Sequence, residues 1–514
     1  MKYLLLSLIL CFIALPSVAQ KRAAEQEAMY YIRKAYEYVY SQPENALKYL
    51  QLFETYLDKT LTPQTTSDSL KIYYAWVVTD LLEGKVVTNR PSINLQTALE
   101  YSNALASKGH PEGYFMLGIL NEDTGNTTNA LRYYHMAAER NHTKALQCLG
   151  ALYEEGKIVK KNLLTAIKWH RKAADLGDTD AQIKLGAMYY YGQGVSEDYT
   201  EAFKWYYRAA ISGNPYAQGF LATMYQNGTG TAQDYLEAAK WYGKSAEQGN
   251  AFGQYGLASM YEIGTGVAQD HKQAFVLFLN AAKQNFAPAQ CSLARMYSEG
   301  RGVEHSYVEA AIWYRKAAEA GYEIAQYRLA MMYEQGIGVA QNYGEAVEWY
   351  RKSAEQENPH AQLQLGVLYL LGYGVKQDYK KGSEYLRGAA GRGIPEAQTY
   401  LGKMYYAGIG VKEDKKFARV LYRKAAEQGF PSAQIELGNM YFRGDGGSLD
   451  REEAAKWYRA AAEQENPEGL YLFGRVLYYG HGVQSDHLQA IRYLQHAAEL
   501  QHEEAMKMLK TITN

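Results

Sequence analysis

The sequence predicts an all-α protein, a right-handed α/α solenoid of 36-residue two-helix repeats. Two observations predict this fold. A short motif, usually Ala-Gln, recurs along the chain at multiples of 36 residues. Between its copies, apolar residues follow helical spacing and are interrupted by glycines. Because two short helices cannot bury their apolar faces alone, neighbouring repeats must stack to complete the core.

The recurring motif sets the boundaries of the predicted solenoid. It opens units at Ala181, Ala217, Gly253, Ala289, Ala325, Ala361, Ala397, Ala433 and Gly469, and Ala145 opens one more. A shorter unit runs from Gly113 to Lys144, and half a unit precedes it. We therefore expect a solenoid of about eleven repeats plus a half repeat over residues 95–504. A C-terminal capping helix is expected over residues 505–514.

One unit, Ala217–Phe252, illustrates the pattern within a repeat. Small or apolar residues at positions 217, 221, 222, 224 and 225 share one face of a first helix. Gly228 suits the left-handed residue that ends this helix. Asp234 suits the N-cap of a second helix, and Gly249 ends that helix.

Two columns of the repeat could be mistaken for functional sites. The first begins the second helix and holds only Asn, Asp or Ser: Asn162, Asp198, Asp234, Asp270, Ser306, Asn342, Asp378, Asp414, Asp450 and Asp486. A metal-binding or catalytic carboxylate would not alternate with Ser and Asn, so we interpret this column as helix caps. The second column holds six of the seven Trp, Trp169, Trp205, Trp241, Trp313, Trp349 and Trp457, which we interpret as core.

The ends of the chain differ from the repeats. Lys2, the apolar run Leu4 to Leu15 and small residues before a cut after Ala19 have the pattern of a signal peptide, residues 1–19. We therefore expect a periplasmic or secreted protein, with no integral membrane segment after signal cleavage. Residues 20–94 lack the 36-residue pattern but keep helical spacing. We expect an N-terminal helical capping region there, with a separate docking domain as the alternative.

Composition and motifs exclude several classes of function. The chain has 54 Lys and Arg against 55 Asp and Glu, so no strong basic field would hold nucleic acid. Cys148 and Cys291 are expected to stay reduced as small buried side chains. There is no His-Glu-x-x-His, Gly-x-Ser-x-Gly, Cys-x-x-Cys or Ser-x-x-Lys motif. We therefore predict no enzyme activity, no cofactor and no metal.

The individual repeats identify a family. The residues Ala181-Gln182-Ile183-Lys184-Leu185-Gly186-Ala187-Met188-Tyr189, Gly192-Gln193-Gly194-Val195, Asp198, Ala202, Trp205-Tyr206, Ala209-Ala210 and Gly213 carry the signal. This pattern resembles the Sel-1-like repeat family, a relative of the tetratricopeptide repeat. The resemblance implies an α/α solenoid that binds other proteins or assembles complexes. Some exported bacterial members are called beta-lactamase-like and staple each unit with a Cys pair, which this sequence lacks.

Helical geometry predicts where a partner would bind. Counting the opening residue of each unit as zero, positions 2, 6 and 9 of the first helix lie opposite its core-facing positions. We expect this stripe on the concave side, pointing away from the core. Its candidate binding residues are Tyr190, Tyr255, Tyr327, Tyr406, Phe442, Tyr471, Tyr478, Lys403 and Arg475. Aromatic and arginine side chains dominate protein-binding hot spots. The alternative is that these tyrosines fill gaps between helices.

The sequence thus supports one leading hypothesis and two alternatives. The leading hypothesis is an exported protein–protein interaction scaffold or adaptor that binds a protein or peptide along the solenoid surface. One alternative is a beta-lactamase-like or cell-wall hydrolase. The other is peptidoglycan or sugar binding, because aromatic side chains stack on sugar rings.

Overall fold

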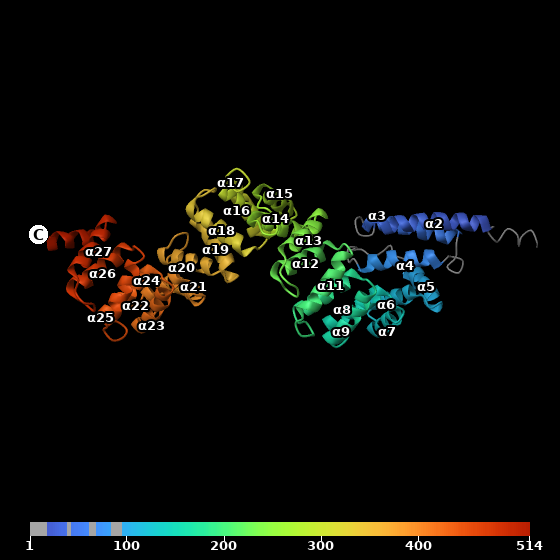
Figure 1. The fold of residues 1–514 in the computed structure, drawn as a ribbon. Coiled ribbons are helices and arrows are strands. Elements are labelled where there is room, and N and C mark those ends of the chain that lie inside the picture. Colours follow the sequence, from blue (N-terminus) through green and yellow to red (C-terminus); the bar gives the residue numbers. More distant parts are fainter. Residues whose placement is uncertain (1–17, 39–42, 61–67, 84–94, 514) are drawn as a thin grey trace, which may run out of the picture. The chain divides into compact units, whose positions relative to one another are not determined.

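The computed structural model describes residues 18–38, 43–60, 68–83 and 95–513, and the elements among them are all helices (Figure 1). The chain divides into two units, Met1–Gln248 and Gly249–Asn514. In both units the helices come in antiparallel pairs, as the 36-residue repeat predicts. The prediction of an all-α repeat fold is confirmed.

The first unit opens with three helices outside the repeat pattern, α2 (Val18–Tyr38), α3 (Pro43–Thr60) and α4 (Asp68–Glu83). α2 packs against α3 and α4, and α4 also packs against the first helices of the repeat array. The Phe53 and Tyr74 rings stack at a centroid distance of 5.6 Å in the core of this region. Most of the predicted signal peptide, residues 1–17, lies outside the described residues.

The repeat array of the first unit follows directly. A single helix, α5 (Leu95–Ser107), corresponds to the expected half repeat. Four helix pairs come after it: α6 (Pro111–Asp123) with α7 (Thr127–Ala138), α8 (Thr143–Glu155) with α9 (Leu163–Asp175), α10 (Thr179–Tyr190) with α11 (Tyr199–Ile211), and α12 (Pro215–Asn227) with α13 (Tyr235–Glu247).

The second unit consists of seven helix pairs and a last helix, α28 (Glu503–Thr513). The pairs are α14 (Ala251–Ile263) with α15 (His271–Lys283), α16 (Ala287–Glu299) with α17 (Tyr307–Glu319), α18 (Glu323–Gln335) with α19 (Tyr343–Glu355), α20 (Pro359–Leu371) with α21 (Tyr379–Gly391), α22 (Pro395–Ala407) with α23 (Lys415–Glu427), α24 (Pro431–Arg443) with α25 (Arg451–Ala462), and α26 (Pro467–Tyr479) with α27 (His487–Glu499). Each second helix packs on its own first helix and on the first helix of the next pair.

The interpretation of the Asn, Asp and Ser column as helix caps is confirmed. The side chain of Asp234 accepts a hydrogen bond from the backbone N–H of Glu237 at 3.0 Å, and Ser306 does the same for Glu309 at 3.2 Å. The loop glycine before each cap also has the expected left-handed backbone, with φ of 68° at Gly228. These contacts fix the turn between the two helices of a repeat.

The Trp column is only partly core. Trp205, Trp241 and Trp349 are buried, whereas Trp169, Trp313 and Trp457 are half-buried. In five repeats a cation three residues later covers the ring, as Lys244 does for Trp241 with Nζ 3.8 Å from the centroid. Packing and cation–π contacts within the helix therefore explain why Trp occupies this column.

The Ala-Gln motif ties one repeat to the next. Nε2 of Gln218 donates to the Ala210 carbonyl at 3.2 Å, and its Oε1 accepts from Nε2 of Gln248 at 2.8 Å. The same glutamine pair recurs as Gln254 with Gln284, Gln326 with Gln356, Gln398 with Gln428 and Gln434 with Gln464. Three motif glutamines, Gln182, Gln290 and Gln362, have a buried Oε1 with no hydrogen-bond partner in the described part of the chain. In these repeats the donor position holds Ser212, Ala320 or Arg392 instead of Gln.

Among the described residues, Cys148 and Cys291 are half-buried and in no disulfide. Burial raises the pKa of Cys291 to about 11. The helices between residues 18 and 513 include none with both the length and the apolar character to cross a bilayer.

Candidate functional site

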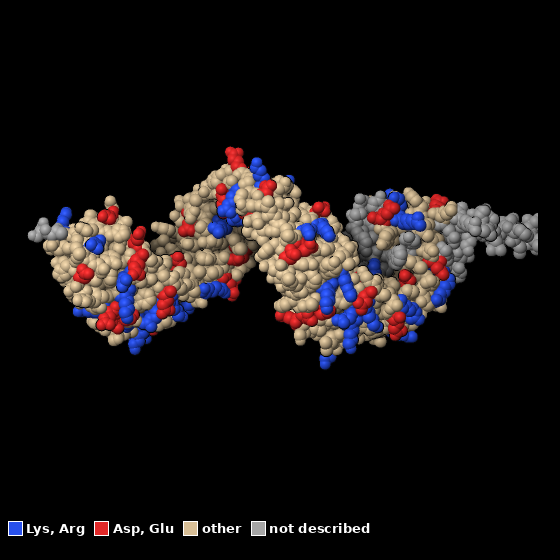
Figure 2. Space-filling view, in the orientation of Figure 1, with Lys and Arg blue, Asp and Glu red and all other residues tan. Residues whose placement is uncertain are grey.

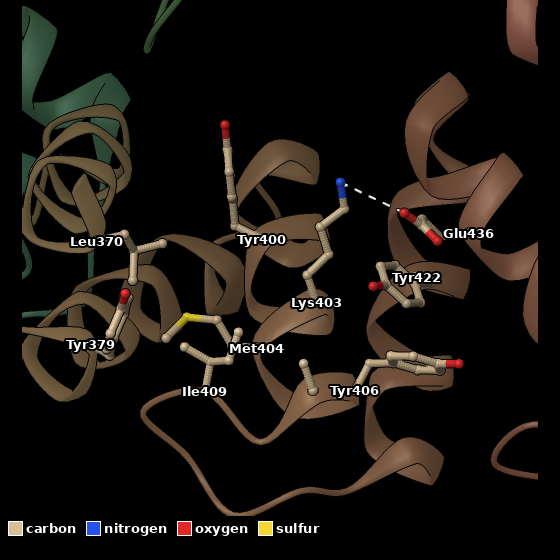
Figure 3. Close-up of a pocket in the computed structure, with 10 residues that line it drawn as sticks. Leu370, Tyr379, Tyr400, Lys403, Met404, Tyr406, Ile409, Tyr422 and Glu436 are labelled. Carbon is tan, nitrogen blue, oxygen red and sulfur yellow. Dashed lines mark ion pairs between the residues drawn. The ribbon is translucent and has the colours of Figure 1, made fainter.

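A hollow of about 420 Å³ opens in the second unit, between the first helices of three successive repeats, α20, α22 and α24 (Figure 3). It is mostly apolar. Its lining residues are Leu370, Tyr379, Tyr400, Lys403, Met404, Tyr406, Ala407, Ile409, Tyr422 and Glu436. A concave, mainly apolar site with a few polar groups is the usual form of a ligand site.

The hollow coincides with a single small residue, Ala407, at the end of α22. Nine of the ten full units carry a larger side chain at this position: Glu155, Tyr191, Asn227, Ile263, Glu299, Gln335, Leu371, Arg443 and Tyr479. Leu371 occupies the equivalent place one repeat earlier and is 52% exposed, so the fold tolerates an apolar side chain there. The absence of side-chain volume at Ala407 thus helps to leave this space open.

The inner wall of the hollow is apolar and its rim is aromatic. Met404 is buried and Leu370 is half-buried, while Ile409 is 44% exposed. Tyr400 and Tyr379 are 42% and 43% exposed and lie on different repeats. An apolar side chain that enters from solvent would therefore be shielded from water on several sides.

Tyr422 forms a fixed wall of the hollow. Its ring lies against Gly402, where an added Cβ would come within 2.8 Å of it, so the glycine allows the two helices to approach closely. Burial raises the pKa of Tyr422, and the Glu436 carboxylate raises it further. The Tyr422 hydroxyl therefore stays protonated at neutral pH.

Two charged groups face the hollow. Nζ of Lys403 lies 3.6 Å from Oε1 of Glu436, and Figure 3 shows this ion pair beside Tyr400. The Lys403 side chain is 52% exposed and that of Glu436 is 35% exposed. At this distance and exposure the pair is weak, so both groups are available to a ligand.

Tyr406 is held in place from the next repeat. Its hydroxyl donates to Oδ2 of Asp445 at 2.8 Å, and Lys415 lies over its ring with Nζ 5.0 Å from the centroid. The hydrogen bond from Tyr406 lowers the pKa of the Asp445 carboxyl, and Lys415, 3.4 Å from that carboxyl, lowers it further. The Asp445 carboxylate is thus charged and bound to Tyr406 at neutral pH.

Of the nine predicted binding residues, Lys403 and Tyr406 line the hollow. The expectation that the aromatic residues point away from the core is wrong. Tyr406, Phe442, Tyr471 and Tyr478 are half-buried and pack against one core cluster of the second unit. Each ring at position 9 is covered by the first residue of its own second helix or by the loop of the next repeat. Tyr478 stacks on His487 at 4.6 Å, and Phe442 lies 5.7 Å from His481, both between ring centroids.

The other predicted residues also make packing contacts. Tyr255 lies 5.4 Å from Phe286, and Tyr327 lies 5.8 Å from Tyr350, between ring centroids. In the last repeat Tyr471 stacks on His502 at 4.8 Å, and the guanidinium of Arg475 lies 5.4 Å from the Tyr471 centroid. In the first unit Tyr190 contacts Tyr199 at 5.2 Å. These contacts support the alternative that the tyrosines fill gaps between helices.

Sequence reasoning missed most of the residues that form the hollow. Tyr400 and Glu436 lie at position 3 of their units, and Tyr379 begins a second helix, so none belongs to the predicted stripe. The one usable signal was Ala407, a small residue in a column of larger ones. Among the described residues there is no group of three or more His, Cys, Asp or Glu that could hold a metal ion.

The comparisons with known proteins agree with this architecture. The Sel1 repeat model matches eleven segments, residues 111–142, 145–178, 179–214, 215–250, 251–286, 287–322, 324–358, 359–393, 395–430, 431–466 and 467–502. No curated protein matches the chain.

Two solved structures extend the comparison. A protective antigen of uropathogenic Escherichia coli that displays an SLR fold is 35% identical with a TM-score of 0.65, and the match covers 81% of this chain and 90% of that one. A Sel1 repeat protein from Oxalobacter formigenes is 34% identical with a TM-score of 0.49, over 60% of this chain and 90% of that one. With eleven matched repeats and the Escherichia coli neighbour, the chain belongs to the Sel1 repeat family, whose helical arrays are generally protein-interaction scaffolds.

Proposed function

We propose that the protein is an exported interaction scaffold that binds a segment of another protein in the hollow between α20, α22 and α24. The observation that supports this most directly is the open apolar wall of Leu370, Met404 and Ile409 beside the exposed Tyr400 and Tyr379 rings. Burying one aliphatic or aromatic side chain there would contribute about 1.5–3 kcal/mol. Aromatic rims around an apolar centre are typical of protein-binding hot spots.

The lining favours binding over hydrolysis. Among its ten residues there is no Ser, Cys or His that could serve as a nucleophile with a neighbouring base. The hydroxyls present belong to tyrosines, and that of Tyr422 is held protonated by burial. The lining thus lacks the Ser, Cys and His groups of the common hydrolytic triads, which favours contact with a ligand over bond cleavage.

The export part of the proposal is supported by the N-terminal sequence. Lys2, the apolar run and the small residues before Gln20 fit a secretory signal. Expression of the full chain in a bacterial host, followed by fractionation and N-terminal sequencing, tests this directly. A mature chain in the periplasm or medium that starts near Gln20 supports export, and an intact chain retained in the cytoplasm contradicts it.

Filling the hollow tests the binding site. Ala407→Leu copies the residue that the preceding repeat carries at this position, so the fold should accept it. Gln335→Leu places the same side chain at the same position of α18 and is the matched control. A displayed library of random peptides should yield binders of the wild-type chain that also bind Gln335→Leu and are lost on Ala407→Leu. Binders that keep equal affinity for all three proteins would place the binding surface elsewhere.

A further inference from the structure

We propose that the segment bound in the hollow is an acidic peptide, with one apolar side chain in the hollow and carboxylates on both sides of it. This inference rests on the proposed function and specifies its partner. The observations that carry it are the distribution of charge along the chain, the cations around the hollow and the position of Glu436.

Charge is distributed unevenly along the second unit. The two repeats that form most of the hollow, residues 361–432, contain twelve Lys and Arg and six Asp and Glu. The two repeats before them, residues 289–360, contain seven and ten, and the two after them, residues 433–504, contain six and twelve. The hollow therefore lies in a basic section with acidic sections on either side, in a chain with a net charge of −1. Such a local field attracts an anionic partner and repels a cationic one.

Several of the cations lie next to the hollow. Lys403 lines it, and Lys415, which is paired with Asp445 at 3.4 Å, covers the ring of Tyr406, which also lines it. Lys380 directly follows the lining residue Tyr379, and Lys412 shares a loop with Ile409. Lys380 and Lys412 are exposed. Figure 2 shows charged side chains gathered along the lower edge of the second unit, over α21, α23 and α25, while much of the rest of that face is uncharged.

Glu436 acts as the competitor that an acidic ligand must displace. It is the one carboxylate among the lining residues, and it contacts Lys403 at 3.6 Å. A ligand carboxylate that reached Lys403 would replace this long contact with a closer one. Removing the charge of Glu436 should therefore strengthen the binding of an acidic peptide. Removing it should weaken the binding of a basic peptide, which would use Glu436 as its partner.

The hollow favours a peptide over a sugar as the source of the negative charge. Leu370, Met404 and Ile409 offer no side-chain hydrogen-bonding group, whereas a sugar ring carries hydroxyls that must be satisfied on burial. A Leu or Phe side chain carries no hydroxyl. An acidic oligosaccharide remains an outcome that the experiment distinguishes.

The test uses three synthetic fluorescent peptides with one central Leu, flanked by Glu, by Ser or by Lys residues. Anisotropy titrations are made with the full chain. The Glu-flanked peptide should bind the wild type at least about tenfold more tightly than the Ser-flanked one, and the Lys-flanked one should not bind. Raising the ionic strength to about 1 M, where the Debye length is ~3 Å, should remove this preference.

The variants separate the apolar contact from the charge. Ala407→Leu should weaken binding of the Glu-flanked peptide about tenfold or more, because it fills the hollow. Lys403→Gln should weaken it about two- to fivefold, and Glu436→Gln should strengthen it by a similar factor. Lys456→Gln, on the second helix α25 away from the lining, should leave it unchanged.

Each other outcome has a defined meaning. Binding that needs an open hollow but shows no preference for Glu would overturn this inference and leave the proposed function intact. If no peptide binds the wild type more tightly than Ala407→Leu, the proposed function itself is overturned. An acidic oligosaccharide that displaces the peptide at lower concentration than unlabelled peptide would assign the site to sugar. Salt-sensitive dimerisation in sedimentation experiments, lost in Ala407→Leu, would make a second copy of the chain the occupant.

Discussion

A gain of stability should follow from completing one broken glutamine pair. The buried Oε1 of Gln290 has no hydrogen-bond partner in the described part of the chain, and Ala320 occupies the position from which a glutamine donates in other repeats. We predict that Ala320→Gln stabilises the second unit. Gln284, which holds the equivalent place one repeat earlier, donates to Oε1 of Gln254 at 2.9 Å and also to a backbone carbonyl at 2.9 Å.

The magnitude follows from these contacts. A satisfied hydrogen bond contributes about 0.5–1.5 kcal/mol, and the relief of a buried unsatisfied acceptor adds to this. Ordering the new glutamine side chain costs up to about 1.5–2 kcal/mol. The expected net gain is about 1 kcal/mol. The backbone needs no change, because Ala320 has φ −72° and ψ 0°, and Gln248 has φ −81° and ψ 7° at its own helix end.

Hydrogen exchange measured by mass spectrometry can locate this gain. Amides of α16 and α17 should exchange about fivefold more slowly in Ala320→Gln, while α8 and α9 of the first unit serve as the internal reference. Ala320→Glu is the matched control, because it has the same length but its carboxylate cannot donate a hydrogen bond. Equal protection in the Gln and Glu variants would refute the reasoning.

Three further predictions concern caps, pH and aromatic packing. Asp234→Ala should cost ~0.5–2 kcal/mol in a denaturant titration and Asp234→Ser much less, because serine can also cap; equal losses would contradict capping. Burial lowers the pKa of His142 to about 4, and its neutral Nδ1 accepts the backbone N–H of Ala145. The unfolded chain binds this proton first, so stability should fall by about 1–3 kcal/mol as the pH drops from about 6.5 to about 4. His142→Asn, with a cap that does not titrate, should lose that part of the pH dependence in denaturant titrations at both pH values. Truncating Tyr406, Phe442 and Tyr478 to Ala should lower the melting temperature, because the rings are half-buried; unchanged melting with weaker peptide binding would return all three to the binding surface.

The features that sequence predicted well are local ones. The cap at Asp234 and the turn glycine Gly228 depend only on a few neighbouring residues, so their roles follow from residue type and spacing. The repeat period then extends them to every unit. The N-terminal residues 20–94 were less informative because they share no period, and residues 84–94 lie outside the described residues.

The candidate site was predicted poorly for a physical reason. A helical wheel treats the first helix of each repeat in isolation and assigns Phe442 and Tyr478 to the face opposite the core. In the folded chain that face meets the start of the second helix and the next loop, where His487 and His481 cover these rings. The hollow depends on side chains from three repeats and on the small size of Ala407, which no single-helix pattern represents.

The glutamine junctions have a consequence for how the gene can change in length. Every bond at the junction of Gln218 and Gln248 joins residues no more than 35 positions apart, within one repeat period. Unequal recombination that adds or removes a whole period anywhere in the array therefore restores an equivalent junction on both sides of the break. A change of only a few residues is tolerated in the loop inside a repeat, as between α6 and α7, where residues 124–126 suffice. The same change between a second helix and the next first helix would separate Gln218 from the Ala210 carbonyl to which it donates, so length variation should concentrate in the inner loops and in whole repeats.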